Sequence, residues 1–439
     1  MNLLSGSSNS PARRTGVVTV LDVGSSKVSC IIAKLMPRDE GAMLRGRTHD
    51  IRVIGIGHHR SEGVKSGVIT DLDGAEKAIR HAVDAAERMA GIMVDSLIVN
   101  VSAGRIKSET YSATVNLGGE EADAHDIKRV LEAGARQAQA AERQVIHSLP
   151  TGYVLDGERG IRDPLGMIGD TLGVDMHVLT GDAAPLRNLE LAVNRCHLSV
   201  ERMVATPYAS GLAALVDDET EMGAACIDIG GGTMTMAVFV NGRFVHGDSI
   251  PVGGRHITMD LARGLSTRVE AAERLKAMYG SALPSAADDR DIVSIPAIDG
   301  EDSDATDGQQ VPRAVVTRII RARTEEMLEQ VRDRLNASGY GAVVGRRVVL
   351  TGGAAQLNGL PEVARRILGR NVRVGRPLGV AGLPAAAKGP AFSTTVGLMI
   401  YPQVAGLETS AMKHSIWNRK LTGTGGRLSR VGQWLRDNL

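Results

Sequence analysis

Residues 17–27 read VVTVLDVGSSK, and residues 224–233 read AACIDIGGGT. In both stretches an apolar, β-rich run ends at an aspartate, a turn of glycine and hydroxyl residues follows, and a second apolar run begins. A single Asp-Gly turn between two strands is the ordinary signal of a hairpin. Two such hairpins, about two hundred residues apart, are what a nucleotide clamped between two related domains requires, and we expect that arrangement.

The turns of the two hairpins are suited to binding phosphate. Glycine adopts positive φ and lets the backbone approach a ligand closely, so successive N–H groups can converge on phosphate oxygens. Asp22 and Asp228 lie at the mouth of the turns, where we expect their carboxylates to hold Mg²⁺ through its water ligands. The predicted phosphate-binding residues are Gly24, Ser25, Ser26 and Lys27 in the first hairpin and Gly230, Gly231, Gly232 and Thr233 in the second.

A third glycine turn lies further along the chain. Residues 346–357 read RRVVLTGGAAQL, a β-branched strand that runs into glycines and then a helix. Such a turn places a helix N-terminus beside an anionic group. With three motifs in this order, the chain resembles the actin, Hsp70 and sugar-kinase superfamily, whose phosphate-1, phosphate-2 and adenosine motifs follow one another in the same way. The resemblance implies a two-domain α/β fold that binds ATP with Mg²⁺.

Composition and charge exclude several other classes of protein. A chain of 439 residues is too long for one core and suggests roughly two to four compact units. The net charge of +1 and the aromatic content of 3% provide neither a basic field nor stacking surfaces for nucleic acid. The scattered Cys30, Cys196 and Cys226 suggest neither a disulfide framework nor a zinc site. The sequence contains no P-loop, no complete dinucleotide fingerprint, and no apolar run that would serve as a signal peptide or membrane span.

Hydrophobic periodicity and turn residues divide the chain into segments. We expect an opening meander of strands at 16–35 and 51–57, and a further strand at 96–104. The predicted helices are 71–91, 123–141, 184–197, two within 251–279, and a long one at 313–337. An acidic loop at 281–312 brackets a short strand, DIVSIP. Residues 1–15 are predicted to form a disordered tail, and residues 403–426 a linker.

Six stretches of the sequence narrow the resemblance from the superfamily to one family within it. They are LDVGSSKV (21–28), VIHSLPTGYVLDGERGIRDPLGM (145–167), DIGGGTM (228–234), IPVGGRHITMDLA (250–262), LTGGAAQLNGL (350–360) and STTVGLM (393–399). With them the chain resembles the FtsA family of bacterial actin homologues, over nearly its whole length except the ends and the 281–312 loop. The resemblance implies subdomain 1A at 16–102 and 179–216, an inserted SHS2-like subdomain 1C at 103–178 in place of the usual actin subdomain 1B, and a second domain at 217–402 with subdomain 2B at about 241–340.

The family resemblance also implies residues around the adenosine. Glu273 and Lys276 would bracket ribose and adenine, and Gly352, Gly353 and Ala354 would close the adenosine side. From the residues alone, Glu273 and Lys276 also fit a solvated helix pair, worth about 0.2–0.5 kcal/mol. The resemblance favours nucleotide binding for this pair.

One position departs from the superfamily pattern. Chaperone and filament members carry a Glu-Pro dipeptide in the connecting segment, whose carboxylate orients the attacking water, and this chain has Thr206-Pro207 there. General-base help, worth about 10²- to 10⁴-fold in rate, is then missing unless another residue supplies it. We therefore expect ATP binding with at most slow hydrolysis.

The C-terminal residues 427–439 read RLSRVGQWLRDNL and follow helical spacing. The predicted apolar face consists of Leu428, Val431, Trp434 and Leu435, and the flanks include Arg427 and Arg430. Tryptophan and leucine beside arginine are typical of a helix that lies in a membrane interface. The alternative is a helix that docks on the protein's own core, but the glycine-containing segment before it favours the membrane.

Together with these features, the resemblance to the FtsA family implies a cell-division protein. We expect an ATP-binding actin-like protein that polymerises on the cytoplasmic face of the cell membrane at the division septum and anchors the tubulin-like FtsZ there. The expected partners are the FtsZ C-terminal peptide, further copies of the chain, the anionic membrane surface and later division proteins, and not nucleic acid. Two alternatives stay open: a PilM-like homologue that binds a pilus-assembly peptide and lacks the terminal helix, and an active kinase or chaperone ATPase, which needs a carboxylate near Thr206.

Overall fold

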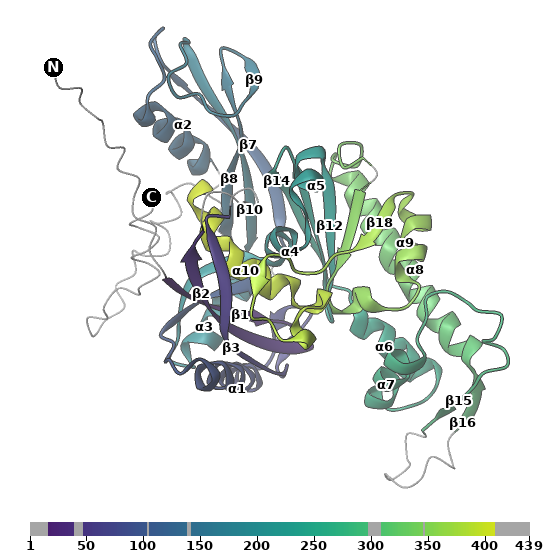
Figure 1. Ribbon diagram of the computed structural model, residues 1–439. Coiled ribbons are helices and arrows are strands. Elements are labelled where there is room, and N and C mark those ends of the chain that lie inside the picture. Colours follow the sequence, from purple (N-terminus) through teal and green to yellow (C-terminus); the bar gives the residue numbers. More distant parts are fainter. Residues whose placement is uncertain are drawn as a thin grey trace.

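The structure is a computed structural model, which describes residues 16–38, 47–102, 105–137, 142–296, 309–345 and 347–408. These residues form two α/β domains side by side, with a smaller α/β module that projects from the first (Figure 1). The predicted tail at 1–15 and the predicted membrane helix at 427–439 lie outside the described residues.

The first domain is built on a six-stranded sheet with the strand order β11-β6-β1-β2-β3-β19. Its strands are β1 (Gly16–Val23), β2 (Lys27–Pro37), β3 (His49–Arg60), β6 (Ser96–Val101), β11 (Ser199–Ala205) and β19 (Val380–Ala381). β1, β2 and β3 form an antiparallel meander, whereas β6 and β11 run parallel to β1. A short hairpin of β4 (Val64–Lys65) and β5 (Val68–Ile69) follows the meander. The predicted opening meander is therefore confirmed.

Two helices cover the outer face of this sheet: α1 (Leu72–Ala90) packs on β2 and β3, and α3 (Ala183–Asn194) packs on α1 and β11. The side chain of Asp71 caps α1 by accepting a hydrogen bond from the backbone N of Asp73. The helix ends at Gly91, whose φ of 69° is the left-handed C-cap conformation that glycine adopts without strain. The helix predicted at 71–91 thus has the expected bounds.

The inserted module is an antiparallel sheet with the order β7-β10-β8-β9, covered by one helix. Its elements are β7 (Lys107–Asn116), α2 (Ala124–Arg136), β8 (Arg143–Leu155), β9 (Glu158–Ile161) and β10 (Thr171–Asp182). Helix α2 is shorter than the predicted 123–141, and β10 continues beyond residue 178. The module has its own hydrophobic cluster, which includes Val130, Leu172, Val174 and Met176.

The second domain has a five-stranded sheet with the order β14-β13-β12-β17-β18. Its strands are β12 (Ala224–Ile229), β13 (Met234–Val240), β14 (Arg243–Ile250), β17 (Arg347–Thr351) and β18 (Asn371–Val374), and its helices are α5 (Asp217–Met222), α6 (Gly254–Gly264), α7 (Val269–Tyr279), α8 (Arg313–Ala337) and α9 (Leu360–Leu368). A hairpin of β15 (Ile292–Ile295) and β16 (Gln309–Pro312) lies at the outer end. Because β14 pairs with β13 in the central sheet, the subdomain predicted at about 241–340 begins only after Ile250.

Two helices lie between the domains: α4 (Thr206–Ala214) and α10 (Ser393–Val404) (Figure 1). They pack closely where Gly397 faces Ala209, since a Cβ at Gly397 would lie 1.8 Å from the Ala209 carbonyl oxygen. Only glycine permits this approach. Helix α10 also packs on β1 of the first domain, and α4 packs on β12 and β13 of the second. The two sheets are therefore joined through this helix pair.

Helix α10 corrects the predicted start of the linker at residue 403. The helix continues to Val404, and the 3-10 turn η4 (Ala405–Leu407) follows. The side chain of Gln403 fixes this end, because its Oε1 accepts a hydrogen bond from the backbone N of His49 at 3.0 Å. The linker was predicted from the loss of periodicity after residue 402, so it began two residues too early. Residues 409–426 lie outside the described residues.

Candidate functional site

The two glycine hairpins predicted from the sequence face each other across the domain boundary. In each turn one backbone hydrogen bond closes the loop, from Gly24 N to Lys27 O at 3.0 Å and from Gly230 N to Thr233 O at 2.9 Å. A Cβ added at Gly232 would lie 2.4 Å from Ser25 Oγ. The tips of the hairpins are therefore in contact, and this contact requires a residue without a side chain.

The third glycine turn lies against the second hairpin, because β17 runs parallel to β12. Gly352 has a φ of 88°, and a Cβ there would lie 2.3 Å from Asp228 Oδ1. A Cβ at Gly254, in the first turn of α6, would lie 2.8 Å from the Ala354 side chain. The backbone N of Gly254 in turn donates to Gly230 O at 2.9 Å. The predicted phosphate and adenosine motifs thus come together around the start of α6.

The structure places Glu273 and Lys276 beside the same helix start. Lys276 Nζ donates to Glu273 Oε2 at 2.7 Å, to Thr258 Oγ1 at 2.8 Å and to Gly254 O at 3.2 Å. The Lys276 side chain is mostly buried, whereas that of Glu273 is 56% exposed. The pair is therefore more than a solvated i,i+3 contact, because Lys276 also donates to Gly254 and Thr258 of α6. Gly254 in turn contacts the second hairpin at Gly230.

Two buried carboxylates, from Asp22 on β1 and Asp228 on β12, lie at the base of the hairpins. Asp22 Oδ2 accepts a hydrogen bond from Thr395 Oγ1 at 3.0 Å. Asp228 Oδ2 accepts from Thr394 Oγ1 at 2.9 Å and from Ser210 Oγ at 2.5 Å. The first turn of α10 therefore orients the acids of both domains, and the sequence analysis gave these hydroxyl residues no role.

The charged groups of the site are largely removed from solvent. Burial raises the pKa of Asp22 to about 6, although Lys27 opposes the shift, and burial also raises the pKa of Asp228. Burial lowers the pKa of Lys27, whose Nζ lies 3.1 Å from the centroid of the Phe392 ring. This Nζ is buried and finds no hydrogen-bond acceptor among the described residues.

These groups fit a nucleotide with a divalent cation. A buried ammonium with unused donors is costly unless an anion accepts them, and phosphate oxygens are suitable acceptors. Two carboxylates that face the same position suit Mg²⁺, which prefers oxygen ligands and keeps several waters. Lys27 would therefore contact phosphate, while Asp22 and Asp228 would hold the hydrated cation. The cation would neutralise the acids and the charge of the phosphates.

The raised pKa of Asp22 predicts a measurable pH dependence of stability in the absence of nucleotide and divalent cations. Because the folded-state pKa of about 6 exceeds the ordinary value of 3.8, the unfolded chain releases this proton first. The residue therefore lowers the free energy of unfolding as the pH rises from about 4 to about 6, by about 3 kcal/mol in all. We expect this decrease in the free energy of unfolding to be absent from Asp22→Asn when urea titrations at about pH 4 and about pH 7 are compared. Parallel pH curves for variant and wild type would contradict the assignment.

Thr206 begins α4 and lies in a buried hydrogen-bond network. Its Oγ1 accepts from Asn100 Nδ2 at 3.2 Å and shares a hydrogen bond of 2.9 Å with Ser102 Oγ. Asn100 Oδ1 accepts from the backbone N of Val23, which ends β1 immediately before the first hairpin turn. The connecting segment therefore reaches the phosphate turn through hydroxyl and amide groups. Among the residues that the structure describes, no carboxylate belongs to this network.

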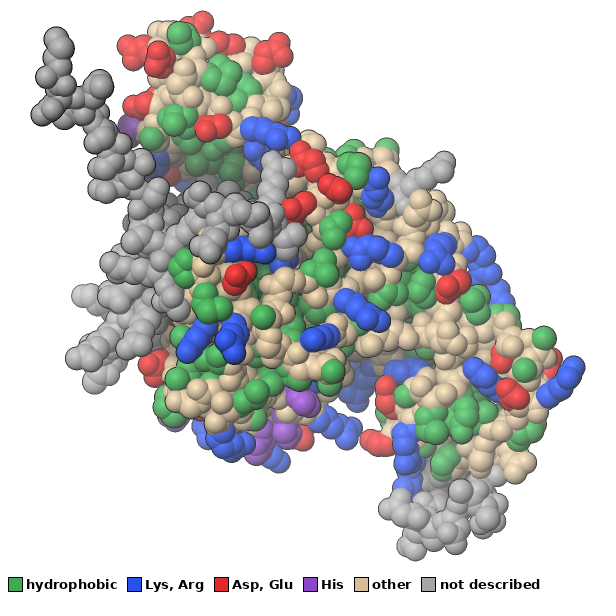
Figure 2. Space-filling view, viewed as in Figure 1, with side chains coloured by type: hydrophobic (Ala, Val, Ile, Leu, Met, Phe, Trp, Pro, Cys, Tyr) green, Lys and Arg blue, Asp and Glu red, His purple; other side chains and the backbone are tan. Residues whose placement is uncertain are grey.

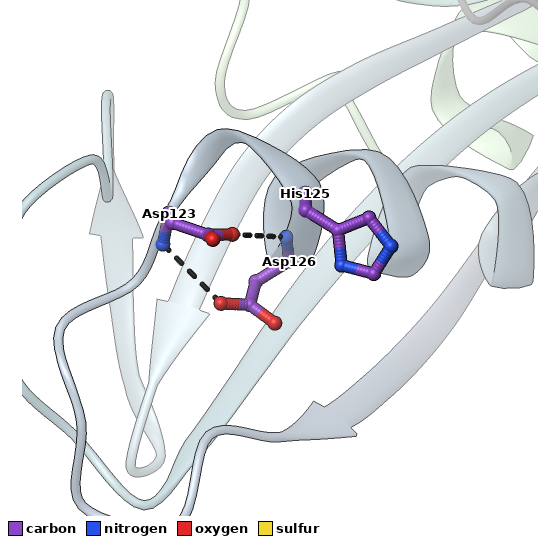
Figure 3. Close-up of side chains that lie close together, drawn as sticks. All are labelled: Asp123, His125 and Asp126. Atoms are coloured by element: carbon purple, nitrogen blue, oxygen red, sulfur yellow. Dashed lines mark hydrogen bonds between the residues drawn. The ribbon is translucent and has the colours of Figure 1, made fainter.

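A cluster of Asp123, His125 and Asp126 has the composition of a metal site but a different role (Figure 3). Asp123 Oδ1 accepts from Asp126 N at 2.8 Å, and Asp126 Oδ2 accepts from Asp123 N at 3.3 Å. This reciprocal pair is a capping box at the start of α2. Asp126 also pairs with Arg129 at 2.7 Å. The carboxylates are therefore already engaged in capping the start of the helix.

Two further features lie apart from the hairpins. A cavity of about 440 Å³ lies between β7, β14 and the end of α8, and its lining includes Ser108, Thr110, His246 and Tyr340. None of its lining residues belongs to the predicted nucleotide site. In the part of the chain that the structure describes, no helix is long and apolar enough to cross a bilayer.

Family comparisons match the two parts of the molecule separately. The family described as "Cell division protein FtsA" matches residues 225–397, and the "SHS2 domain inserted in FTSA" matches residues 103–180. The cell division protein FtsA of Rhizobium meliloti is 63% identical over 98% of this chain and 96% of its own. Those of Pseudomonas aeruginosa and Escherichia coli are 31% and 30% identical, each over 96% of this chain and over 98% and 97% of their own.

Solved structures share the fold at low sequence identity. The PilM-PilN type IV pilus biogenesis complex has a TM-score of 0.59 and 14% identity, covering 89% of this chain and 98% of that one. MreB5 of Spiroplasma citri bound to ADP has a TM-score of 0.51 and 13% identity, covering 89% and 97%. These likenesses concern the fold alone. With the matched inserted domain, they confirm the predicted actin-like fold with an SHS2-like insertion.

Proposed function

The chain belongs to the FtsA family of cell-division proteins, and from this premise we propose that it is an ATP-binding, actin-like protein that holds FtsZ at the cytoplasmic face of the cell membrane. It acts at the division septum as a peripheral protein, associates with further copies of itself and recruits later division proteins. The observation that carries the nucleotide part is the buried Lys27 ammonium beside Asp22 and Asp228, which has no hydrogen-bond acceptor among the described residues.

ATP with Mg²⁺ is the proposed ligand of this site. Phosphate oxygens would accept hydrogen bonds from the backbone N–H groups of the two hairpins and from the ammonium of Lys27. The adenosine would lie toward Gly352, Ala354 and the Glu273–Lys276 pair, which are positioned beside the start of α6. A fold neighbour, MreB5, is described as bound to ADP, which supports a nucleotide as the ligand class. Hydrolysis is slow, because the network at Thr206 offers the attacking water no carboxylate.

The two alternatives have less support. The chain shares 63% identity with a cell division protein FtsA but 14% with the PilM-PilN complex, and a fold likeness at that level does not carry a pilus function. An active kinase or chaperone ATPase requires a water-activating acid at the connecting segment, and Thr206 stands there with amide and hydroxyl neighbours.

The surface that we assign to FtsZ lies on the outer part of the second domain. Met278, Tyr279 and Ile292 expose 71%, 37% and 55% of their surface. Arg313 Nε donates to Tyr279 O at 3.1 Å, so a cation lies beside these apolar side chains, where it also pairs with Asp288 and Asp291 at 3.7 and 3.6 Å. Figure 2 shows hydrophobic side chains on the lower right lobe, where Figure 1 places β15, with Lys, Arg, Asp and Glu side chains around them. An acidic peptide with apolar anchors fits such a surface.

Helix α8 is not a removable part of this surface. Its buried face includes Val316, Ile320, Met327 and Leu328, which belong to the core of the second domain. Deleting residues 281–337 would therefore test stability rather than binding. Substitutions of exposed side chains test the assignment without this complication.

Co-sedimentation with anionic vesicles tests the proposed function. We expect FtsZ to pellet with the full chain on vesicles of phosphatidylglycerol, and to stay in solution without it. Met278→Glu should pellet normally but recruit FtsZ about tenfold less, because an exposed apolar anchor is worth about 1.5 kcal/mol or more. Met93→Glu, which changes an 82% exposed methionine after α1, is the matched control and should recruit FtsZ like wild type.

Two outcomes would contradict this assignment. If the wild-type chain binds the vesicles and FtsZ stays in the supernatant, the proposed function is wrong. If Met278→Glu recruits FtsZ as well as Met93→Glu does, FtsZ binds through another surface.

A further inference from the structure

The described part of the chain ends in a buried acid, Glu408, just after η4. Its side chain is only 3% exposed, and Oε1 accepts a hydrogen bond from His147 Nδ1 at 2.8 Å. The same carboxylate also faces the buried hydroxyl of Tyr401, whose pKa is raised by burial and by the charge and hydrogen bond of Glu408. A buried carboxylate at the end of a domain core is unusual, because burial of a charge is costly unless its hydrogen bonds are complete. The predicted linker and membrane helix follow directly in the sequence.

His147 joins Glu408 to the connecting segment. It lies on β8, within the 145–167 stretch, and its side chain is fully buried. The backbone N of Ala205 donates to His147 Nε2 at 2.9 Å. Because Nε2 holds an acceptor lone pair, the ring proton is on Nδ1 and points at Glu408. The rings of Tyr208 and Tyr401 meet the imidazole at centroid distances of 5.0 and 5.8 Å in edge-on geometry and fix its orientation.

Ala205 is the last residue of β11, immediately before Thr206 begins α4. Thr206 Oγ1 accepts from Asn100, and Asn100 accepts from the backbone N of Val23 at the first phosphate hairpin. A continuous series of buried contacts therefore runs from the base of the C-terminal segment to the nucleotide side of the first domain. Val23 belongs both to this series and to the pairing of β1 with β2, where it lies opposite Val28.

We propose that Glu408 and His147 are positioning residues that couple the base of the C-terminal segment to the nucleotide cleft, so that nucleotide binding and the docking of residues 405–408 favour each other. The inference rests on the proposed nucleotide binding. In the docked state, Glu408 holds His147, and His147 holds the start of α4 where it supports the phosphate hairpin. In the undocked state, the His147 ring loses its hydrogen bond to Glu408. The first phosphate hairpin then loses the support that it receives through the start of α4.

In the docked state, the 3-10 turn η4 brings Glu408 to His147. Hydrogen bonds in a 3-10 turn have poorer geometry than those of an α-helix, so the side-chain contacts of Glu408 contribute to holding residues 405–408 in place. Coupling between sites is reciprocal, so a partner that draws the chain away from Glu408 weakens nucleotide binding by the same factor by which nucleotide strengthens docking.

Hydrogen exchange and nucleotide titration on the full chain test the coupling. We expect Mg-ATP to slow exchange of the backbone amides at 400–408 in wild type by about threefold or more. Glu408→Ala should lose this protection and bind Mg-ATP about tenfold more weakly. Glu408→Gln keeps an oxygen that can accept from His147 Nδ1 and should retain most of both effects. Gln403→Ala is the matched control, because it removes a hydrogen bond from the same helix end to β3 without touching His147.

The outcomes separate this inference from the proposed function. If wild type binds no Mg-ATP, both fail. If it binds Mg-ATP but exchange at 400–408 is unchanged, the coupling is overturned and nucleotide binding stands. The coupling is also overturned if Glu408→Ala and Gln403→Ala lose exchange protection and Mg-ATP affinity to the same extent. In that case any loosening of α10 has the same effect, and the contact with His147 has no special role. The wild-type exchange measurement decides the matter even if Glu408→Ala does not fold.

Discussion

Gly232→Val abolishes measurable Mg-ATP binding while the protein stays folded. A Cβ at this position would lie 2.4 Å from Ser25 Oγ and 3.0 Å from the backbone N of Ser66, and valine adds two methyl groups beyond that. The side chain would force the two hairpins apart and fill the space in which backbone N–H groups meet phosphate. We expect the dissociation constant measured by calorimetry to rise about 100-fold or more, which corresponds to about 3 kcal/mol.

Gly152→Val is the matched control for this loss. A Cβ at Gly152 meets nothing within 4 Å, and its backbone does not require positive φ, so valine suits the strand β8 that carries it. This variant should bind Mg-ATP like wild type and have a similar melting temperature. A Gly232→Val protein whose affinity stays within about threefold of wild type would show that phosphate does not bind between the hairpins.

Trp434→Glu releases the protein from anionic vesicles at physiological salt. Burying the apolar side chains of the predicted helix 427–439 would remove on the order of 400 Å² from water, worth roughly 10 kcal/mol before the costs of partial insertion and helix folding. Each arginine near an anionic leaflet adds about 1 kcal/mol, which salt screens. The net binding of one copy is therefore weak, and a charge at Trp434 removes it. Association of many copies restores strong binding through avidity.

The chain supplies its own control for the membrane prediction, because its second tryptophan, Trp417, lies in the predicted linker. Trp417→Glu should pellet with vesicles of phosphatidylglycerol like wild type, and both variants should bind Mg-ATP normally. If Trp434→Glu stays on the vesicles, residues 427–439 dock on the protein itself instead. A chain that ends at residue 426 should behave like Trp434→Glu.

Local elements could be predicted because their causes lie within a few residues. The cap at Asp71 and the left-handed Gly91 give α1 its bounds, and the periodicity of 313–337 gives α8 its bounds. The glycine hairpins were predictable for the same reason, since a tight turn with close backbone approach requires glycine whatever surrounds it. Where the periodicity faded, at residue 403, the predicted start of the linker was wrong because a tertiary contact at Gln403 holds the helix end.

The sequence by itself determined the actin-like order of motifs, the family, and which residues form the glycine turns. Only the tertiary structure decided what orients the acids, because Thr395 and Asp22 are 373 residues apart and Thr394 and Asp228 are 166 apart. It also decided that Lys27 Nζ is buried with no hydrogen-bond acceptor in the described part of the chain, and that Glu408 contacts His147 across 261 residues. Turns and helices depend on near neighbours, which a sequence pattern records, whereas these contacts depend on how two sheets and the helices between them pack in space.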